Sequence, residues 1–506
     1  MSRGCGILYP ISSLPSRFGI GCFSKEAYEF ADFLEAAGQG YWQILPIGPT
    51  GFGDSPYQPF SAFAGNPYFI SPETLIEEGL LTWDEMNSRQ FGSDPERVDY
   101  GALYENRFVV LRIAYDRWKE RGGEKAEKDD GSAYEEFCKK EAFWLDDYAL
   151  YMAIKKQQGG KSWQDWEEPL KKRMKSALDE ARQNLADEIG FVCFQQFVFE
   201  QQWEKLKAYI NKKNIKVIGD LPFYMALDSA DVWSHPEAFQ MEKDLTPTAV
   251  AGCPPDAFSA TGQLWGNPLY DWAKLKKNGY AWWMQRIRRN REFYDVIRID
   301  HFHGFAEYYA VPYGEESALN GAMKKGPGMD FFNALREQLG DIPMIAEDLG
   351  TVTKENTKLL KDSGLPGMKV LQFAFTSWNS VYVTHRHEKN CVVYTGTHDN
   401  TTARAWIEEI NDGERSYVRR YINSIYTDYG QFVWDFIREA YRSVADLCII
   451  PIQDYLVKGK EARMNCPGVA DGNWQWRVLP NFLSPELASS IRQLADVYQR
   501  MPSEEE

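Results

Sequence analysis

The chain has 506 residues, too many for one simple hydrophobic core, so we expect a large domain with insertions or several domains. The formal net charge of −16 argues against nucleic acid or an anionic membrane as a partner. The aromatic fraction of 15% fits a surface that stacks on sugar rings, but a large core is the default interpretation.

The eight cysteines are scattered, with no CxxC pair and no spacing typical of metal ligands. The N-terminus lacks the charged and apolar segments of a signal peptide. No apolar run approaches the roughly 18 residues that a membrane helix needs. These features predict a cytoplasmic protein.

Eight short apolar stretches are predicted to form buried strands because they are rich in β-branched and aromatic side chains. In chain order they cover residues 4–10, 41–47, 215–222, 295–302, 343–348, 367–375, 391–399 and 447–454. Helical patterns are clearest at residues 24–37, 98–121, 134–157, 191–213 and 282–294. The last of these helices is expected to carry its arginines, Arg286, Arg288, Arg289 and Arg291, on its polar side.

Two long segments interrupt this alternation. Residues 60–190 are dominated by charged helical patterns and are predicted to be a mainly helical insertion. Residues 223–280 include VAGCPPDAFSATGQLWGNP from Val250, and are predicted to be a loop and helical insertion that covers the active-site cleft. The whole chain, 1–506, is expected to be one catalytic unit.

Eight buried strands joined by helical crossovers predict a parallel sheet, and eight is the number that closes a (β/α)8 TIM barrel. The expected fold class is therefore an α/β barrel with large insertions between barrel strands. A doubly wound open sheet is the alternative. It is disfavoured because no GxGxxG follows an early strand and the polar strand ends are spread over many strands.

The stretch DVIRIDHF from Asp295 begins as a buried strand and ends in charged residues. Arg298 and Asp300 are two residues apart, so they share a strand face, and the cation is expected to keep the carboxylate ionised. An ionised carboxylate at a strand end suits covalent glycosyl transfer. Taken alone, the motif fits a structural Arg–Asp pair equally well.

Acidic residues end four different predicted strands, at Asp220, Asp300, Glu347 and Asp399. A barrel would bring them to one mouth, where two carboxyl groups suffice for glycosyl transfer. Asp300 is the better candidate nucleophile. Glu347 follows the apolar run MIA and adjoins Asp348, which should raise its pKa and suit a proton donor. Asp399 could stabilise positive charge at the reacting carbon.

A metal-dependent isomerase or lyase is a rival interpretation, because strands four and five supply Asp300, His301, His303, Glu347 and Asp348. Against it, no HxH or DxD motif lies inside a strand. No GxxxxGK[ST] phosphate loop is present either.

Seven motifs together resemble the 4-α-glucanotransferases of the amylomaltase type, glycoside hydrolase family 77. They are GDSPYQPFSAFAGNPY from Gly53, GDLPFYMALDSADVW from Gly219, PPDAFSATGQLWGNP from Pro254, RIDHF from Arg298, IAEDLG from Ile345, TGTHDN from Thr395 and RMNCPG from Arg463. The resemblance covers essentially the whole chain. It implies a retaining mechanism on α-1,4-glucans such as maltooligosaccharides, with no metal or organic cofactor.

The resemblance also implies roles for individual residues. Asp300 would be the nucleophile, Glu347 the acid/base and Asp399 the stabiliser of the transition state. The residues matching positions that hold the reacting glucose are Arg298, His301 and His398, and those matching other sugar-binding positions are Ser55, Tyr57, Asp220, Gln263, Trp265 and Asn465.

One position departs from the family pattern. The family loop usually reads PPDYFSATG, whereas this chain has Ala257 at the tyrosine position. That tyrosine is thought to lie over the acceptor side of the cleft, so we expect relatively more hydrolysis here.

Two other functions remain open from the sequence: a plain α-glucan hydrolase, and a glucan-binding protein without turnover. Products longer than maltotriose would exclude the hydrolase. A binding protein should lack a catalytic carboxylate, and none is missing.

Overall fold

The computed structural model describes residues 3–123, 130–255, 260–350, 353–377, 379–425, 428–469 and 471–502. At its centre is a parallel sheet of β1 (Gly4–Leu8), β2 (Tyr41–Gln43), β3 (Lys216–Leu221), β6 (Val296–Ile299), β9 (Met344–Ala346), β10 (Gly367–Val370), β11 (Cys391–Tyr394) and β12 (Leu447–Pro451). The strand order is β10-β11-β12-β1-β2-β3-β6-β9, so neighbouring strands follow one another along the chain and the last strand, β12, lies beside the first, β1. The Ala346 N–H donates to the Pro366 carbonyl (2.9 Å) and links β9 to the start of β10. The predicted barrel is confirmed, and each predicted strand contains one of these strands.

The barrel interior explains why polar strand ends meet. Ile218, Val296 and Ile345 belong to one buried apolar cluster, which the inward side chains of the other barrel strands complete. Residues two positions further along a strand point the same way. The side chains that follow on the inward face are therefore those of β3, β6 and the end of β9, namely Asp220, Arg298 and Glu347.

Helices cover the outside of the barrel. α16, for example, is capped by Asp428, which accepts from the Gln431 N–H (2.8 Å), and it buries an apolar face that includes Phe432 and Phe436. The helices that follow barrel strands are α1 (Lys25–Ala36), α11 (Ala281–Phe293), α12 (Met329–Leu339), α13 (Lys354–Ser363), α14 (Ala403–Glu409), α15 (Asp412–Tyr421), α16 (Tyr429–Arg442), α17 (Ile452–Tyr455) and α18 (Pro485–Val497).

Helix α11 corrects one expectation. Arg288 and Arg291 are exposed, but Arg286 and Arg289 are buried. Arg289 forms an ion pair with Glu200 (2.6 Å), and Arg286 donates to the Pro222 carbonyl (2.6 Å). The prediction of a single polar arginine face is wrong, because two of the arginines join the barrel wall and the neighbouring helices.

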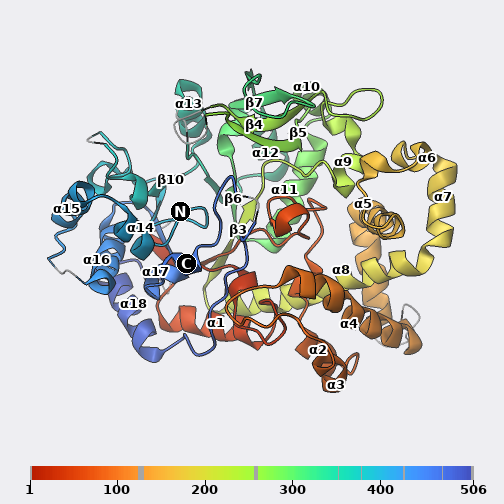
Figure 1. Cartoon of the computed structure of the whole chain (residues 1–506), viewed down its shortest axis with the longest axis horizontal. Coiled ribbons are helices and arrows are strands. Elements are labelled where there is room, and N and C mark those ends of the chain that lie inside the picture. Colours follow the sequence, from red (N-terminus) through yellow and green to blue (C-terminus); the bar gives the residue numbers. More distant parts are fainter. Residues whose placement is uncertain are drawn as a thin grey trace.

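The chain between β2 and β3 is mostly helical and lies to the right and below the barrel in Figure 1. Its two longest helices, α5 and α8, pack against each other. The helices of this segment are α2 (Pro72–Glu77), α3 (Trp83–Asn87), α4 (Tyr100–Glu120), α5 (Asp130–Gln157), α6 (Glu168–Lys171), α7 (Lys175–Asn184) and α8 (Ala186–Lys212).

A second sheet, at the top of Figure 1, was not predicted from the sequence. It is antiparallel, with the order β5-β4-β7-β8, and contains β4 (Ala249–Cys253), β5 (Gln263–Pro268), β7 (Glu307–Pro312) and β8 (Ala322–Lys325). The glycines and prolines of β4 and β5 hide the strand pattern, and β7, the partner of β4, lies beyond the next barrel strand. Two short helices, α9 (Ala230–Ser234) and α10 (Trp272–Lys277), flank these strands in the chain.

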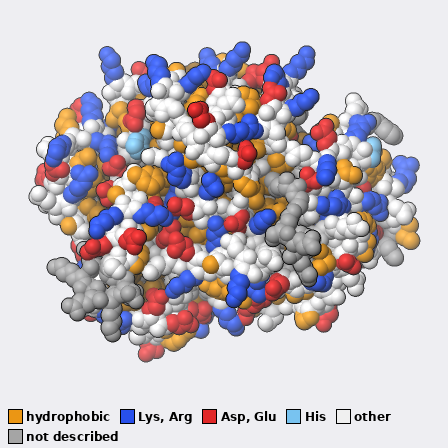
Figure 2. Space-filling model, turned by 180° about the vertical axis from the view of Figure 1, so that it is seen from behind, with side chains coloured by type: hydrophobic (Ala, Val, Ile, Leu, Met, Phe, Trp, Pro, Cys, Tyr) orange, Lys and Arg blue, Asp and Glu red, His pale blue; other side chains and the backbone are white. Residues whose placement is uncertain are grey.

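Charges of both signs are interspersed over the face seen in Figure 2, so the negative net charge is not gathered there in one patch. Within the described residues, no helix combines the length and the apolar character needed to cross a membrane.

Candidate active site

A cavity of about 840 Å³ opens at the carboxyl ends of the barrel strands. The three predicted catalytic acids, Asp300, Glu347 and Asp399, all line it, although they follow different strands. Seven predicted sugar-binding residues line it as well: Ser55, Tyr57, Gln263, Trp265, His301, His398 and Asn465. Two predicted site residues, Asp220 and Arg298, are instead buried behind its wall.

Arg298 lies between two acids. Its Nη1 is 2.5 Å from Asp220 Oδ2 and 3.6 Å from Asp300 Oδ1. The Tyr57 hydroxyl donates to the same Asp220 oxygen (2.7 Å). The Asp300 side chain is 28% exposed, whereas those of Arg298 and Asp220 are almost fully buried. The buried pair therefore forms a charged support beneath an acid that faces the cavity.

The environment of Asp300 raises its pKa above the usual range. Burial is the largest cause, and the negative charge of Asp220 is the next, while Arg298 acts in the opposite direction. Glu347 and Asp399 raise this pKa further. Arg298 lowers the pKa of Asp300, which is the predicted direction, but the expectation that Arg298 dominates is wrong, because the cation is paired most closely with Asp220.

Glu347 is held by backbone donors on both oxygens. The His301 N–H donates to Oε2 (2.8 Å), and the Leu349 N–H donates to Oε1 (2.9 Å). Burial nevertheless raises the pKa of Glu347 to about 7, against lowering contributions from Arg298 and these N–H groups. Asp348 raises it slightly. The predicted direction and both of its predicted causes are confirmed.

Asp399 is fixed from two sides. The Asn465 side-chain amide donates to Oδ1 (2.7 Å), and His398 Nε2 lies 3.4 Å from Oδ2. The Arg463 guanidinium donates to the Asp399 backbone carbonyl (3.0 Å). Burial lowers the pKa of His398, so its imidazole is neutral at pH 7. The Asp399 carboxylate is thus oriented by an amide and a neutral ring.

Aromatic rings form two parts of the cavity wall. Tyr57 stacks on His398, with ring centroids 5.2 Å apart and an interplanar angle of 17°. Trp265 meets His301 edge to face at 5.1 Å. Flat apolar faces beside a few precisely oriented polar groups are typical of a site for sugar rings.

Comparison with known proteins agrees with this chemistry. The sequence profile of the 4-alpha-glucanotransferases, glycoside hydrolase family 77, matches residues 9–482. The chain belongs to this family. It is 47% identical to the 4-alpha-glucanotransferase of Clostridium butyricum, over 97% of this chain and 99% of the relative. It is 43% identical to that of Thermus thermophilus, over 99% and 100%.

The fold agrees with a solved member of the glucanotransferase family. The amylomaltase from Streptococcus agalactiae, solved in complex with acarbose, superposes with a TM-score of 0.95 at 38% identity. The match covers 99% of this chain and 100% of that one. The family assignment made from the sequence motifs is thereby confirmed, together with the 4-alpha-glucanotransferase activity.

Several residues of this glucanotransferase cleft were missed in the sequence. Tyr224 follows β3 closely, so a search of all polar residues after strand ends could have found it. Leu264 and Asn267 lie on β5, which was not predicted. Val469 and Trp474 lie well after the end of the last barrel strand, and nothing in the neighbouring sequence indicates that they line the cavity. Ala257 lies outside the described residues.

Of the five residues named for a metal site, two lie off the cavity. Asp348 does not line the cavity, and instead accepts from the Met368 N–H (2.7 Å). His303 is buried and also off the cavity. In the described part of the chain, no three His, Cys, Asp or Glu side chains are grouped closely enough to bind a metal ion.

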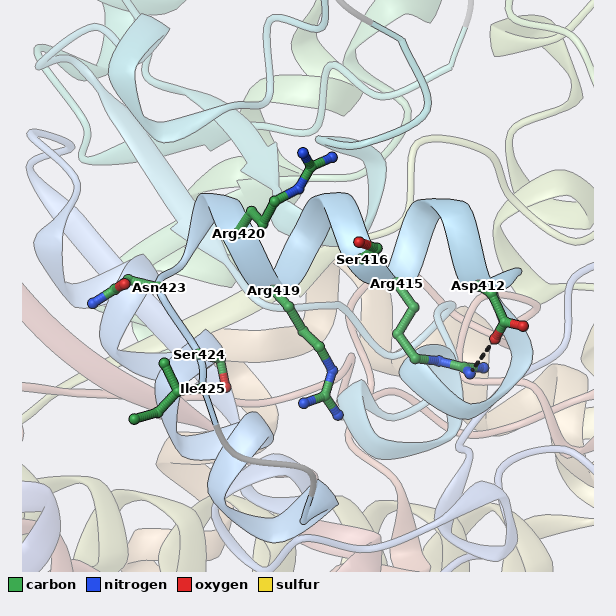
Figure 3. Close-up of a pocket in the computed structure, with 8 residues that line it drawn as sticks. All are labelled: Asp412, Arg415, Ser416, Arg419, Arg420, Asn423, Ser424 and Ile425. Atoms are coloured by element: carbon green, nitrogen blue, oxygen red, sulfur yellow. Dashed lines mark hydrogen bonds and ion pairs between the residues drawn. The ribbon is translucent and has the colours of Figure 1, made fainter.

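A second hollow of about 470 Å³ lies along α15 (Figure 3). Arg419 and Arg420 leave this helix in different directions. Arg415 donates to the carbonyls of Ile407 and Ile410 (2.9 Å each) and pairs with Asp412 (2.8 Å). Asp412 is the single acid in the described lining, so this hollow offers no pair of carboxyl groups for glycosyl transfer.

Proposed function

We propose that this glucanotransferase moves α-1,4-glucan segments between maltooligosaccharides, or to glucose, by a retaining double displacement. Asp300 acts as the nucleophile, Glu347 as the acid/base, and Asp399 stabilises the transition state. The observation that carries this assignment is that three acids from three different barrel strands line one cavity beside aromatic rings. A retaining pair requires carboxyl groups about 5–5.5 Å apart.

The raised pKa values fit one proton shared by Asp300 and Glu347 near neutral pH. Two carboxyl groups that share a site do not both ionise readily, so they titrate as a coupled pair. We place the proton on Glu347 because Arg298 Nη1 is 3.6 Å from Asp300 and favours the negative charge there. This leaves Asp300 ready to attack and Glu347 ready to donate.

In the first displacement, an Asp300 oxygen bonds to the anomeric carbon while the bond to the leaving glucan breaks. Glu347 gives its proton to the leaving oxygen. In the second, Glu347 takes the proton from the 4-hydroxyl of an acceptor glucan, whose oxygen displaces Asp300. Asp399 faces the positive charge that develops in both transition states, held by Asn465 and His398.

Transfer must compete with water at about 55 M, so the cleft has to bind the acceptor and exclude water. We propose that residues 223–280 act as its cover, since Tyr224, Gln263 and Trp265 come from this segment and line the cavity. Residues 60–190 are proposed as a second, helical insertion within one catalytic unit of residues 1–506. We place the enzyme in the cytoplasm, supported by the buried cysteines Cys5, Cys22, Cys391 and Cys448, which form no disulfide.

Maltotriose tests the activity. The wild type should produce glucose and a ladder of longer glucans. Glu347→Gln should abolish the ladder with unchanged thermal unfolding, and Glu337→Gln, an exposed acid on α12, should behave as wild type. If the wild type forms no product longer than maltotriose, the result would favour a hydrolase.

The nucleophile can be identified separately. α-Maltotriosyl fluoride needs no proton for departure of fluoride, so Glu347→Ala should still be glycosylated. The ester should accumulate because no base activates the acceptor. Mass spectrometry should place it on Asp300. A label on another residue would refute the assignment.

A further inference from the structure

Trp474 lies where three distant parts of the chain meet. Its ring centroid is 5.6 Å from that of Tyr57 and 6.0 Å from that of His398, and these two rings stack on each other. Tyr57 comes from the loop after β2, His398 from the loop after β11, and Trp474 from the segment after β12. The three rings form a cluster at the cleft wall.

The backbone of Trp474 is held in an uncommon conformation. Its φ is +63°, in the left-handed region that non-glycine residues rarely occupy. Two hydrogen bonds fix it there: the Trp474 N–H donates to the Met464 carbonyl (2.8 Å), and the Tyr100 hydroxyl donates to the Trp474 carbonyl (2.9 Å). The side chain is only 6% exposed. The backbone that carries the indole is therefore held at two points, and the residue is largely buried.

The two rings that Trp474 contacts each reach the catalytic acids. The Tyr57 hydroxyl donates to Asp220, which pairs with Arg298 behind the proposed nucleophile. His398 Nε2 lies 3.4 Å from Asp399. The Met464 carbonyl that receives the Trp474 N–H directly precedes Asn465, the other partner of Asp399. A displacement of the indole would therefore disturb both sides of the proposed reaction centre.

We propose that Trp474 is a positioning residue, which fixes the rings of Tyr57 and His398 and through them the wall against which the reacting sugar is held. This inference rests on the proposed function. It predicts that loss of the Trp474 ring lowers the rate of glucan transfer because His398 and Tyr57 are displaced, and not because the protein becomes less stable.

Trp476 supplies a matched control. It belongs to the same segment and is 4% exposed, and its carbonyl accepts from the Ser13 hydroxyl (2.7 Å). It does not line the cleft. A leucine at either position removes a buried indole, but only the change at Trp474 removes the ring that contacts Tyr57 and His398.

The test compares maltotriose transfer per active site, counted by the burst of fluoride from α-maltotriosyl fluoride. Trp474→Leu should lower kcat/KM about tenfold, because misplaced groups at a reaction centre cost rate steeply. Trp476→Leu should stay within about twofold of wild type on the same per-site basis, and Trp474→Phe, which keeps a ring, should fall between them.

A double-mutant cycle shows whether the effect passes through His398. Adding Trp474→Leu to His398→Ala should cost clearly less than the tenfold that it costs in the wild type, since one of the two rings to be positioned is already absent. The role of Trp474 would be overturned if the loss in kcat/KM of the double variant equalled the product of the losses of the two single variants. Equal rates for the leucine variants at 474 and 476 would overturn it as well. Failure of the wild type itself to form a ladder from maltotriose would instead overturn the proposed function and this inference with it.

Discussion

Arg298 forms its closest ion pair with Asp220 on the neighbouring strand, although Asp300 lies two residues away on its own strand. Asp220 and Arg298 are paired directly in the register between β3 and β6, and Nη1 is 2.5 Å from Oδ2. The pair is almost fully buried. Breaking such a pair leaves a buried charge without its partner, which is far more costly than losing a surface pair.

Asp220→Asn should therefore lower the free energy of unfolding by about 3 kcal/mol in urea denaturation. Asp179→Asn removes a half-exposed acid that pairs with Lys175 on α7, and should cost less than about 1 kcal/mol. Similar losses in the two variants would contradict a special role for the buried pair.

The same Asp220→Asn change should alter the pH profile. The negative charge of Asp220 raises the pKa of Asp300, so its removal should lower that pKa and leave Arg298 to favour the Asp300 carboxylate. The acid limb of kcat/KM should shift to lower pH, whatever happens to the maximal rate. A shift to higher pH would count against the proposed electrostatics.

The alkaline limb should report Glu347. Its pKa is raised to about 7, and the proposed first displacement needs it protonated, so kcat/KM should fall as the pH rises through about 7. Asp348→Asn removes a negative charge that raises this pKa, and should move the limb to lower pH by less than about one unit. Asp341→Asn, at a 98% exposed acid, should leave the limb in place.

Asp454 links stability to pH. It is buried, accepts from the Thr395 hydroxyl (2.6 Å) and the Ala403 N–H (2.8 Å), and has its pKa raised to about 6. The native state thus binds this proton more tightly than the unfolded chain does. Stability from this group is present below the unfolded pKa of about 4 and is lost as the pH rises through about 6.

Asp454→Asn removes that dependence. The free energy of unfolding of the variant minus that of wild type should increase from pH 4.5 to pH 7, because only the wild type loses stability as Asp454 ionises. A constant difference across this range would show that Asp454 does not titrate as described. Thr395→Val removes a hydrogen bond that lowers this pKa, so it should instead make the loss of stability with rising pH larger than in wild type.

Ala257 allows a test of how the cleft excludes water, and the basis of this test is the sequence alone. Ala257→Tyr restores the side chain that the family loop usually has, so it should lower the ratio of hydrolysis to transfer. The ratio is measured as reducing ends formed per longer glucan from maltotriose. An unchanged ratio would show that acceptor binding does not depend on this position.

The sequence by itself determined the barrel and its acids. The barrel strands are short, largely buried apolar runs, and Asp300 and Glu347 stand directly after such runs while Asp399 follows five residues after the end of β11, so the signal is local. Only the tertiary structure decided which acid Arg298 pairs with, that β4 and β5 form strands, and that Trp474 reaches the cleft. Those features depend on contacts between segments far apart in the chain. The sequence of one segment does not show which distant segment it will contact, although these contacts supply the stabilising free energy.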